Sequence, residues 1–131
     1  MFDCGLLRVV LRVQAAFYVL TGAWPLINIE SFEWITGPKT DDWLVHTVGL
    51  LLMAIGLTLW VGARAAKPDT AIILLAAATA ACLAAIDVTY ALTGRISAIY
   101  LLDAAVEVVL LFAIIVGWLR MRSRHADDRH A

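Results

Sequence analysis

The stretch TAIILLAAATAACLAAIDVTYAL, residues 70–92, contains one charged side chain, Asp87. About 20 consecutive apolar residues are enough to cross the hydrocarbon core of a bilayer as an α-helix. Three further apolar runs occupy residues of about 5–29, 43–62 and 96–119. A soluble core cannot bury four such runs in so short a chain. The sequence therefore predicts an all-α integral membrane protein that crosses the bilayer four times.

Composition agrees with this class. Of the 131 residues, 63% are hydrophobic and 16% are charged, whereas a typical soluble domain is about half apolar and about a quarter charged. Four spans with their loops fill the chain, so we expect a single transmembrane domain over residues 1–131. The net charge of -1 and the lack of a basic stripe give no reason to expect nucleic acid as a partner. Cys4 and Cys82 should lie at different depths, which argues against a disulfide.

Short connections make sequential helices antiparallel neighbours, so the predicted architecture is an up-down-up-down four-helix bundle. Gly49 and Gly56 share one helical face, where they should let another helix approach closely. The run 76–81 consists almost entirely of small residues, which predicts a helix packed inside the bundle. The loop 28–42 mixes acidic and aromatic side chains, as is typical of a segment lying on the membrane interface.

The distribution of Lys and Arg predicts the orientation, because cytoplasmic loops are enriched in these residues. With the N-terminus inside, two basic residues lie outside, Lys39 and Arg95. Eight lie inside: Arg8, Arg12, Arg64, Lys67, Arg120, Arg122, Arg124 and Arg129. Both termini are therefore predicted to be cytoplasmic and the loop 28–42 to be outside. The polar tail 120–131 is expected to be cytoplasmic and frayed.

Ionisable side chains inside membrane spans are costly and mark candidate functional sites. From the outer surface, a rise of about 1.5 Å per residue places His46 roughly 5 Å deep and Asp87 roughly 8 Å deep. The same rise places Asp103 roughly 10 Å deep and Glu107 roughly 16 Å deep. We therefore predict a ligand-binding site in the outer half of the membrane, formed by Asp87, Asp103, Glu107 and His46, with Tyr18 and Tyr100 completing its wall and Gln14 as a weaker candidate.

Asp103 and Glu107 lie four residues apart and share a helical face. Two carboxylates in a low-dielectric site repel each other, so at least one should hold a proton at neutral pH. Such a group suits a proton relay, a general acid or base, or a cation site. A divalent metal would also accept carboxylates with a histidine, but no spacing motif such as HExxH supports this, and no metal site is assigned. The sequence identifies no cofactor.

Structural roles explain the same residues. Asp87 could pair with Arg95 beyond the end of its helix, and Glu107 could contact Arg12 or Gln14. His46 could lie at the interface and bind Asp42 or a lipid headgroup. In that interpretation the polar groups only hold helices together.

The chain resembles the small DoxX-like bacterial inner-membrane proteins, which have four helices. The resemblance is carried by Leu6-Leu7-Arg8, by Val48-Gly49-Leu50-Leu51 and by Ile55-Gly56-Leu57. It implies location in a bacterial inner membrane. It implies no specific activity, because some DoxX-like proteins resemble quinone-linked oxidoreductase subunits and others have no known role.

Three functions are compatible with the sequence. The bundle binds a small lipophilic ligand or an ion; it is an intramembrane acid/base enzyme, such as an isomerase, with a lipophilic substrate; or it is an accessory subunit of a membrane complex. A channel or transporter belongs with the first and would need a homo-oligomer. We favour the first, and a wet or ligand-filled cavity would separate the first two from the third.

Overall fold

The computed structural model describes the backbone from Phe2 to His130 and the side chains from Cys4 to His130. All regular structure in this part of the chain is helical: α1 (Phe2–Ile27), α2 (Ile29–Thr36), α3 (Asp42–Gly62), α4 (Thr70–Leu92) and α5 (Tyr100–His130). Four of these helices are long and apolar enough to cross a membrane. The fifth, α2, lies within the loop that the sequence placed at the interface.

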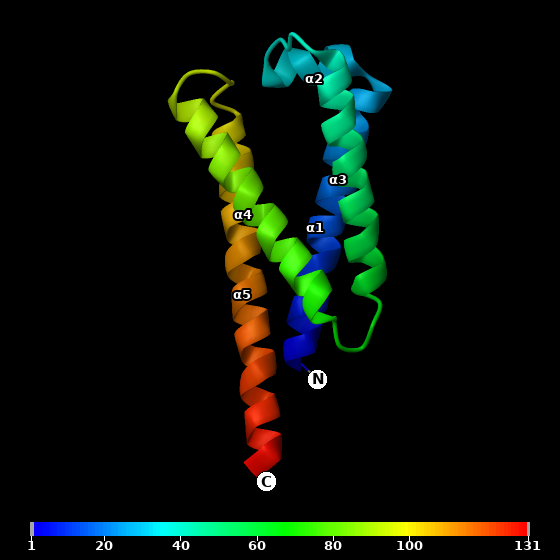
Figure 1. The fold of residues 1–131 in the computed structure, drawn as a ribbon, viewed down its shortest axis with the longest axis vertical. Helices are drawn as coiled ribbons and strands as arrows, with labels where there is room; N and C mark the ends of the chain where they lie inside the picture. Colours follow the sequence, from blue (N-terminus) through cyan, green and yellow to red (C-terminus); the bar gives the residue numbers. More distant parts are fainter. Residues whose placement is uncertain (1, 131) are drawn as a thin grey trace.

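The long helices form two hairpins (Figure 1). The chain direction alternates from one long helix to the next, and α1 packs along α3 while α4 packs along α5. Helix α1 also packs against α5 and joins the hairpins, whereas α3 and α4 make little contact. The hairpins approach each other near the N-terminus and diverge toward the end that carries α2.

Glycines set the close approach of α1 and α3. A Cβ atom on Gly49 would lie 2.5 Å from the carbonyl oxygen of Gly22, and one on Gly56 would lie 2.8 Å from that of Ala15. Only residues without a Cβ fit at such a distance between helix backbones. The prediction that Gly49 and Gly56 face a neighbouring helix is confirmed.

Helix α4 buries one face only. Its buried residues recur every three or four positions, as Ile73, Ala76, Ala80, Ala84 and Asp87. The opposite face is exposed and includes Leu74, Cys82 and Ile86. The prediction that this helix is packed inside the bundle is therefore wrong for half of its surface. Small residues fit closely against a neighbouring helix, but they do not determine how many neighbours the helix has.

The structure shifts the bounds of the last span. Helix α5 starts at Tyr100 rather than near residue 96, because Tyr100 N–H bonds to the carbonyl of Ser97 in a preceding turn. It continues through the expected frayed tail to His130. The Arg122 guanidinium lies 4.9 Å from the Trp118 ring centroid, and Lys67 Nζ lies 2.8 Å from His125 Nε2. These contacts support a helix that projects beyond the rest of the fold (Figure 1).

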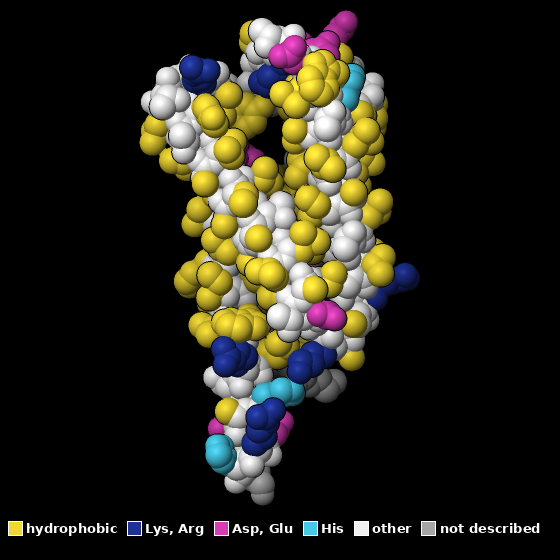
Figure 2. Space-filling view, in the orientation of Figure 1, with side chains coloured by type: hydrophobic (Ala, Val, Ile, Leu, Met, Phe, Trp, Pro, Cys, Tyr) yellow, Lys and Arg dark blue, Asp and Glu magenta, His cyan; other side chains and the backbone are white. Residues whose placement is uncertain are grey.

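The surface divides into zones (Figure 2). Apolar side chains cover the long helices, and most charged side chains gather toward the two ends. Tryptophans lie toward the same ends: Trp24, Trp34 and Trp43 near α2, and Trp60 and Trp118 near the opposite end. Bands of tryptophan that flank an apolar zone are typical of proteins at the two interfaces of a bilayer.

Candidate functional site

A cavity of about 610 Å³ lies where the two hairpins diverge. Its lining comes from all five helices, and the space-filling view shows the hollow between the hairpins with acidic atoms inside it (Figure 2). Most of the walls are apolar side chains, among them Phe17, Leu52, Leu83, Ile99 and Val106. Ligand sites in proteins commonly combine such walls with a few convergent polar groups.

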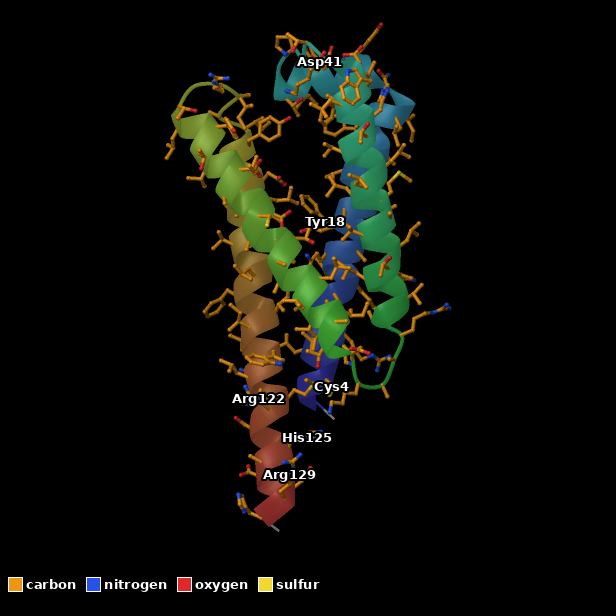
Figure 3. All side chains as sticks on the ribbon, in the orientation of Figure 1. Cys4, Tyr18, Asp41, Arg122, His125 and Arg129 are labelled. Atoms are coloured by element: carbon orange, nitrogen blue, oxygen red, sulfur yellow. The ribbon has the colours of Figure 1, made fainter. Side chains whose placement is uncertain are left out.

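The inner end of the cavity, its floor, is a hydrogen-bonded chain of three buried side chains. The hydroxyl of Tyr18 donates to Glu107 Oε2 at 2.8 Å. The amide of Gln14 donates to Tyr18 Oη and to the carbonyl of Ala76, both at 3.0 Å. Tyr18 lies near the level at which the hairpins separate (Figure 3). The floor therefore joins α1 to both helices of the other hairpin.

Three carboxyl groups converge at this end of the cavity, Asp87, Asp103 and Glu107, and we call them the carboxyl cluster; Glu107 belongs to the floor as well. Asp103 lies one turn before Glu107 on α5, and Asp87 continues the buried alanine face of α4. Asp87, Asp103 and Glu107 all line the cavity. Asp87 is only 6% exposed and Glu107 only 1% exposed.

Two oxygens of the cluster are buried without a hydrogen-bond partner among the described residues, Asp87 Oδ2 and Glu107 Oε1. Buried polar atoms are nearly always satisfied, and an exception needs an explanation. Both residues line the cavity. An occupant of the cavity with hydrogen-bond donors would satisfy them.

Helix α2 and the turn after it place a cation at the outer end of the cavity. Lys39 Nζ donates to the carbonyls of Thr36 at 3.1 Å and Gly37 at 3.0 Å. It also lies 5.1 Å from the ring centroid of Tyr100 and 6.0 Å from that of Phe32. Sequence reasoning did not select Lys39 as a site residue. Its position just after Gly37-Pro38, in an aromatic segment, was the available signal.

The structure brings together most of the predicted site residues. Tyr18, Asp87, Tyr100, Asp103 and Glu107 all line the same cavity. His46 does not line it, although Val45 and Gly49 from the same helix do. Successive side chains of an α-helix are rotated by about 100° about the helix axis, so His46 points away from the face that borders the cavity.

The ion pairs considered from the sequence are not formed. No ion pair joins Asp87 to Arg95, and the hydrogen-bond partner of Glu107 is Tyr18 rather than Arg12. Among the side chains of residues 4–130, no three His, Cys, Asp or Glu residues are arranged to hold a metal ion. Both cysteines are free thiols.

Comparison with known proteins identifies no relative of this chain. No family model matches the chain, and no curated protein or solved structure matches it. The resemblance to DoxX-like proteins therefore stays a prediction, and the function has to be inferred from the cavity.

Proposed function

We propose that this chain is an integral membrane protein that binds a lipophilic small molecule between its two hairpins. The observation that carries the proposal is the cavity of about 610 Å³, with apolar walls and the carboxyl cluster at its inner end. The walls suit an apolar body, and the cluster suits one polar end. A cavity of this size matches the range of small-molecule sites, roughly 300–1,000 Å³.

Several features support a membrane location. Four helices have the length and hydropathy of membrane spans, and large apolar side chains are exposed along all four. The bias of Lys and Arg favours cytoplasmic termini. In that orientation α2 lies on the outer side and the cavity lies in the outer half of the bilayer. A bacterial inner membrane is the location that we propose.

A second, smaller groove supports a ligand that arrives from the bilayer. It measures about 310 Å³ and lies between α3 and α4, the two long helices that barely touch. Val48, Leu52 and Leu83 border both this groove and the cavity. A lipophilic molecule would therefore meet apolar side chains from the lipid surface to the site.

Acid/base catalysis on the bound molecule is a second candidate. The convergence of three carboxyl groups on one cavity favours it, because a positioned carboxyl group can give or take a proton. A purely structural role is less well supported. Side chains that only lock helices together would satisfy one another, whereas Asp87 Oδ2 and Glu107 Oε1 have no partner.

Quenching of Trp24 tests the proposed binding, because Trp24 lines the cavity. The full chain is placed in lipid nanodiscs with Trp24 as its one tryptophan, and 10-bromodecan-1-ol is added. Bromine quenches indole fluorescence at close range, so saturable quenching is expected. The control retains Trp60 instead, which lies outside the cavity lining and should show only the linear quenching due to probe dissolved in lipid.

Matched substitutions on α5 locate the binding. Val106 lines the cavity, whereas Val109 is exposed and does not line it. Val106→Phe should fill part of the cavity and weaken the saturable quenching at least about fivefold. Val109→Phe should leave it unchanged. Equal effects of the two substitutions, or no saturable quenching in the parent protein, would contradict the proposed function.

A further inference from the structure

We propose that the polar end of the ligand is an ammonium group and that binding it releases a proton from the carboxyl cluster. This rests on the proposed function, since the ligand occupies the same cavity. It adds the chemical class of the ligand and an exchange of one cation for one proton.

Hydrogen-bond donors at the floor are already engaged. Tyr18 has one hydroxyl proton, and Glu107 Oε2 accepts it. The two amide protons of Gln14 go to Tyr18 and Ala76. Asp87 Oδ2 and Glu107 Oε1 are left as buried acceptors without donors. A ligand that brings donors would satisfy these oxygens, and an ammonium brings up to three.

Positive charge is also missing at this end of the cavity. Helix α1 presents Gln14 and Tyr18 to the cluster, α4 presents Asp87, and α5 presents Asp103, Glu107 and, one turn before Asp103, Tyr100. No titratable residue of α3 is among the lining residues, and α2 contributes Thr36 and apolar side chains.

Lys39, just after α2, is the one cation among the described lining residues. Its Nζ is held by two backbone carbonyls beside Tyr100, about one helical turn outward from Asp103. The carboxyl cluster therefore lacks a counter-ion of its own.

The cluster must keep protons when no cation is present. Asp87, Asp103 and Glu107 border one cavity, and ionised carboxylates there would repel one another, so the cluster retains a proton. When R–NH₃⁺ enters, its charge replaces that proton in stabilising the carboxylates, and the proton leaves to water through the outer opening. Charge and atoms balance: one cation enters and one H⁺ departs.

The walls favour an organic cation over an inorganic one. An inorganic ion needs several oxygen ligands around it, and no group of three metal-binding side chains is found among residues 4–130. Most of the cavity surface would contribute nothing to such an ion. From Tyr18 to Trp24 the cavity follows α1 for about 9 Å, which accommodates an alkyl chain of medium length.

The test compares two probes that differ only in the head group, 10-bromodecylamine and 10-bromodecan-1-ol. Both are titrated into the full chain in zwitterionic nanodiscs at pH 7, where the amine is protonated. Quenching of Trp24 gives each affinity. Calorimetry in two buffers with different enthalpies of protonation gives the number of protons released. We expect the amine to bind at least about tenfold more tightly and to release about one proton, and the alcohol to release none.

Matched amide substitutions assign the effect. Glu107→Gln and Asp87→Asn should each reduce the preference for the amine to less than about threefold and reduce the proton release. Glu30→Gln, at an exposed carboxyl on α2 outside the cavity lining, should change neither. Circular dichroism and thermal unfolding verify that each variant is folded, and the alcohol reports whether its cavity still binds.

The outcomes separate the two proposals. Equal affinities for the two probes without proton release would overturn the ammonium inference and leave the lipophile site standing. Tighter binding of the amine without proton release would overturn the exchange. An unchanged preference for the amine in both amide variants would show that the carboxyl cluster does not recognise the ammonium group. Failure of both probes to bind in the parent protein would overturn the proposed function itself.

Discussion

Tyr18 is the residue on which the floor of the cavity depends. Its hydroxyl accepts from Gln14 and donates to Glu107, so it joins α1 to α5 through a side chain that is almost fully buried. Removing one partner of a buried hydrogen bond costs more than the bond contributes, because the remaining group is left unsatisfied. The Tyr18 hydroxyl therefore contributes both to the stability of the fold and to the polarity of the site.

Tyr18→Phe should destabilise the protein by about 1–3 kcal/mol, since Glu107 then loses its hydrogen-bond donor in a buried site. Tyr100→Phe is the matched control. Tyr100 also lines the cavity, but it presents the face of its ring to Lys39. The Tyr100→Phe variant should lose less than about 0.5 kcal/mol of stability. Denaturation in mixed detergent micelles measures both changes, and equal losses would contradict the role given to the Tyr18 hydroxyl.

Glu107→Gln and Glu107→Ala should differ in stability. Glutamine retains an oxygen that accepts from Tyr18, so the fold should lose less than about 1 kcal/mol. Alanine leaves the Tyr18 hydroxyl without its acceptor and should cost about 2–3 kcal/mol. Thermal unfolding of the two purified variants compares them. A stability loss in the glutamine variant as large as in the alanine variant would show that shape, rather than hydrogen bonding, governs this position.

Depth could be predicted from the sequence at this scale, but direction could not. The rise per residue placed Asp87, Asp103 and Glu107 in the same half of the membrane, and the structure has them in one cavity. The same reasoning selected His46, which the cavity does not include. Depth depends on position along a helix, whereas direction depends on which neighbour the helix packs against. Only α5 carried two carboxyls on one face, so only there did spacing also indicate direction.

At the scale of elements, the pairing of α1 with α3 is determined by glycine. Gly22 and Gly49 bring the two backbones so close that a Cβ on either would meet the carbonyl oxygen of the other. The sequence indicated Gly49 and Gly56 as a contact face but not the partner helix.

The sequence did not indicate the short helix α2 clearly. Asn28 caps it by accepting from the backbone N–H of Ser31, a local signal that aromatic and acidic neighbours obscured.

Gly49→Ala should destabilise the hairpin of α1 and α3. The new methyl group would lie 2.5 Å from the Gly22 carbonyl oxygen, so a backbone has to move, at a cost of about 1–3 kcal/mol. Gly5→Ala makes the same change in α1 where no atom lies within 4 Å, and should be neutral or stabilise by up to about 1 kcal/mol. Unfolding midpoints in detergent check both. Similar midpoints for the two variants would contradict the close packing at Gly49.

On the scale of the whole molecule, the two hairpins meet at one end and separate at the other. Gly117 of α5 lies against Leu7 of α1 and allows the two helices to approach near the N-terminus. The separation creates the cavity, and α2 lies at its outer end with Lys39. The sequence predicted four spans from hydropathy alone. It could not predict the divergence, because the packing angle between hairpins leaves no periodic pattern.

Cysteine labelling tests the orientation. In a chain with Cys4→Ala and Cys82→Ala, Thr40→Cys should react with an impermeant thiol reagent in intact cells. Ser123→Cys should react only after the membrane is opened. Both positions are exposed on the protein, so the membrane alone should separate them. The opposite pattern would invert the topology and place the cavity in the inner half of the bilayer.

The central claim is that lipophilic molecules enter the space between the hairpins and reach the carboxyl cluster. Photolabelling in membranes tests it most directly, using an alkanol that carries an alkyl diazirine, which forms esters with carboxyl groups when irradiated. Peptide mass spectrometry should find saturable labelling at Asp87, Asp103 or Glu107, which excess unlabelled decanol suppresses. Labelling confined to residues on the lipid-facing surface, such as Val109 and Phe112, with no labelled carboxyl in the cluster, would contradict the account.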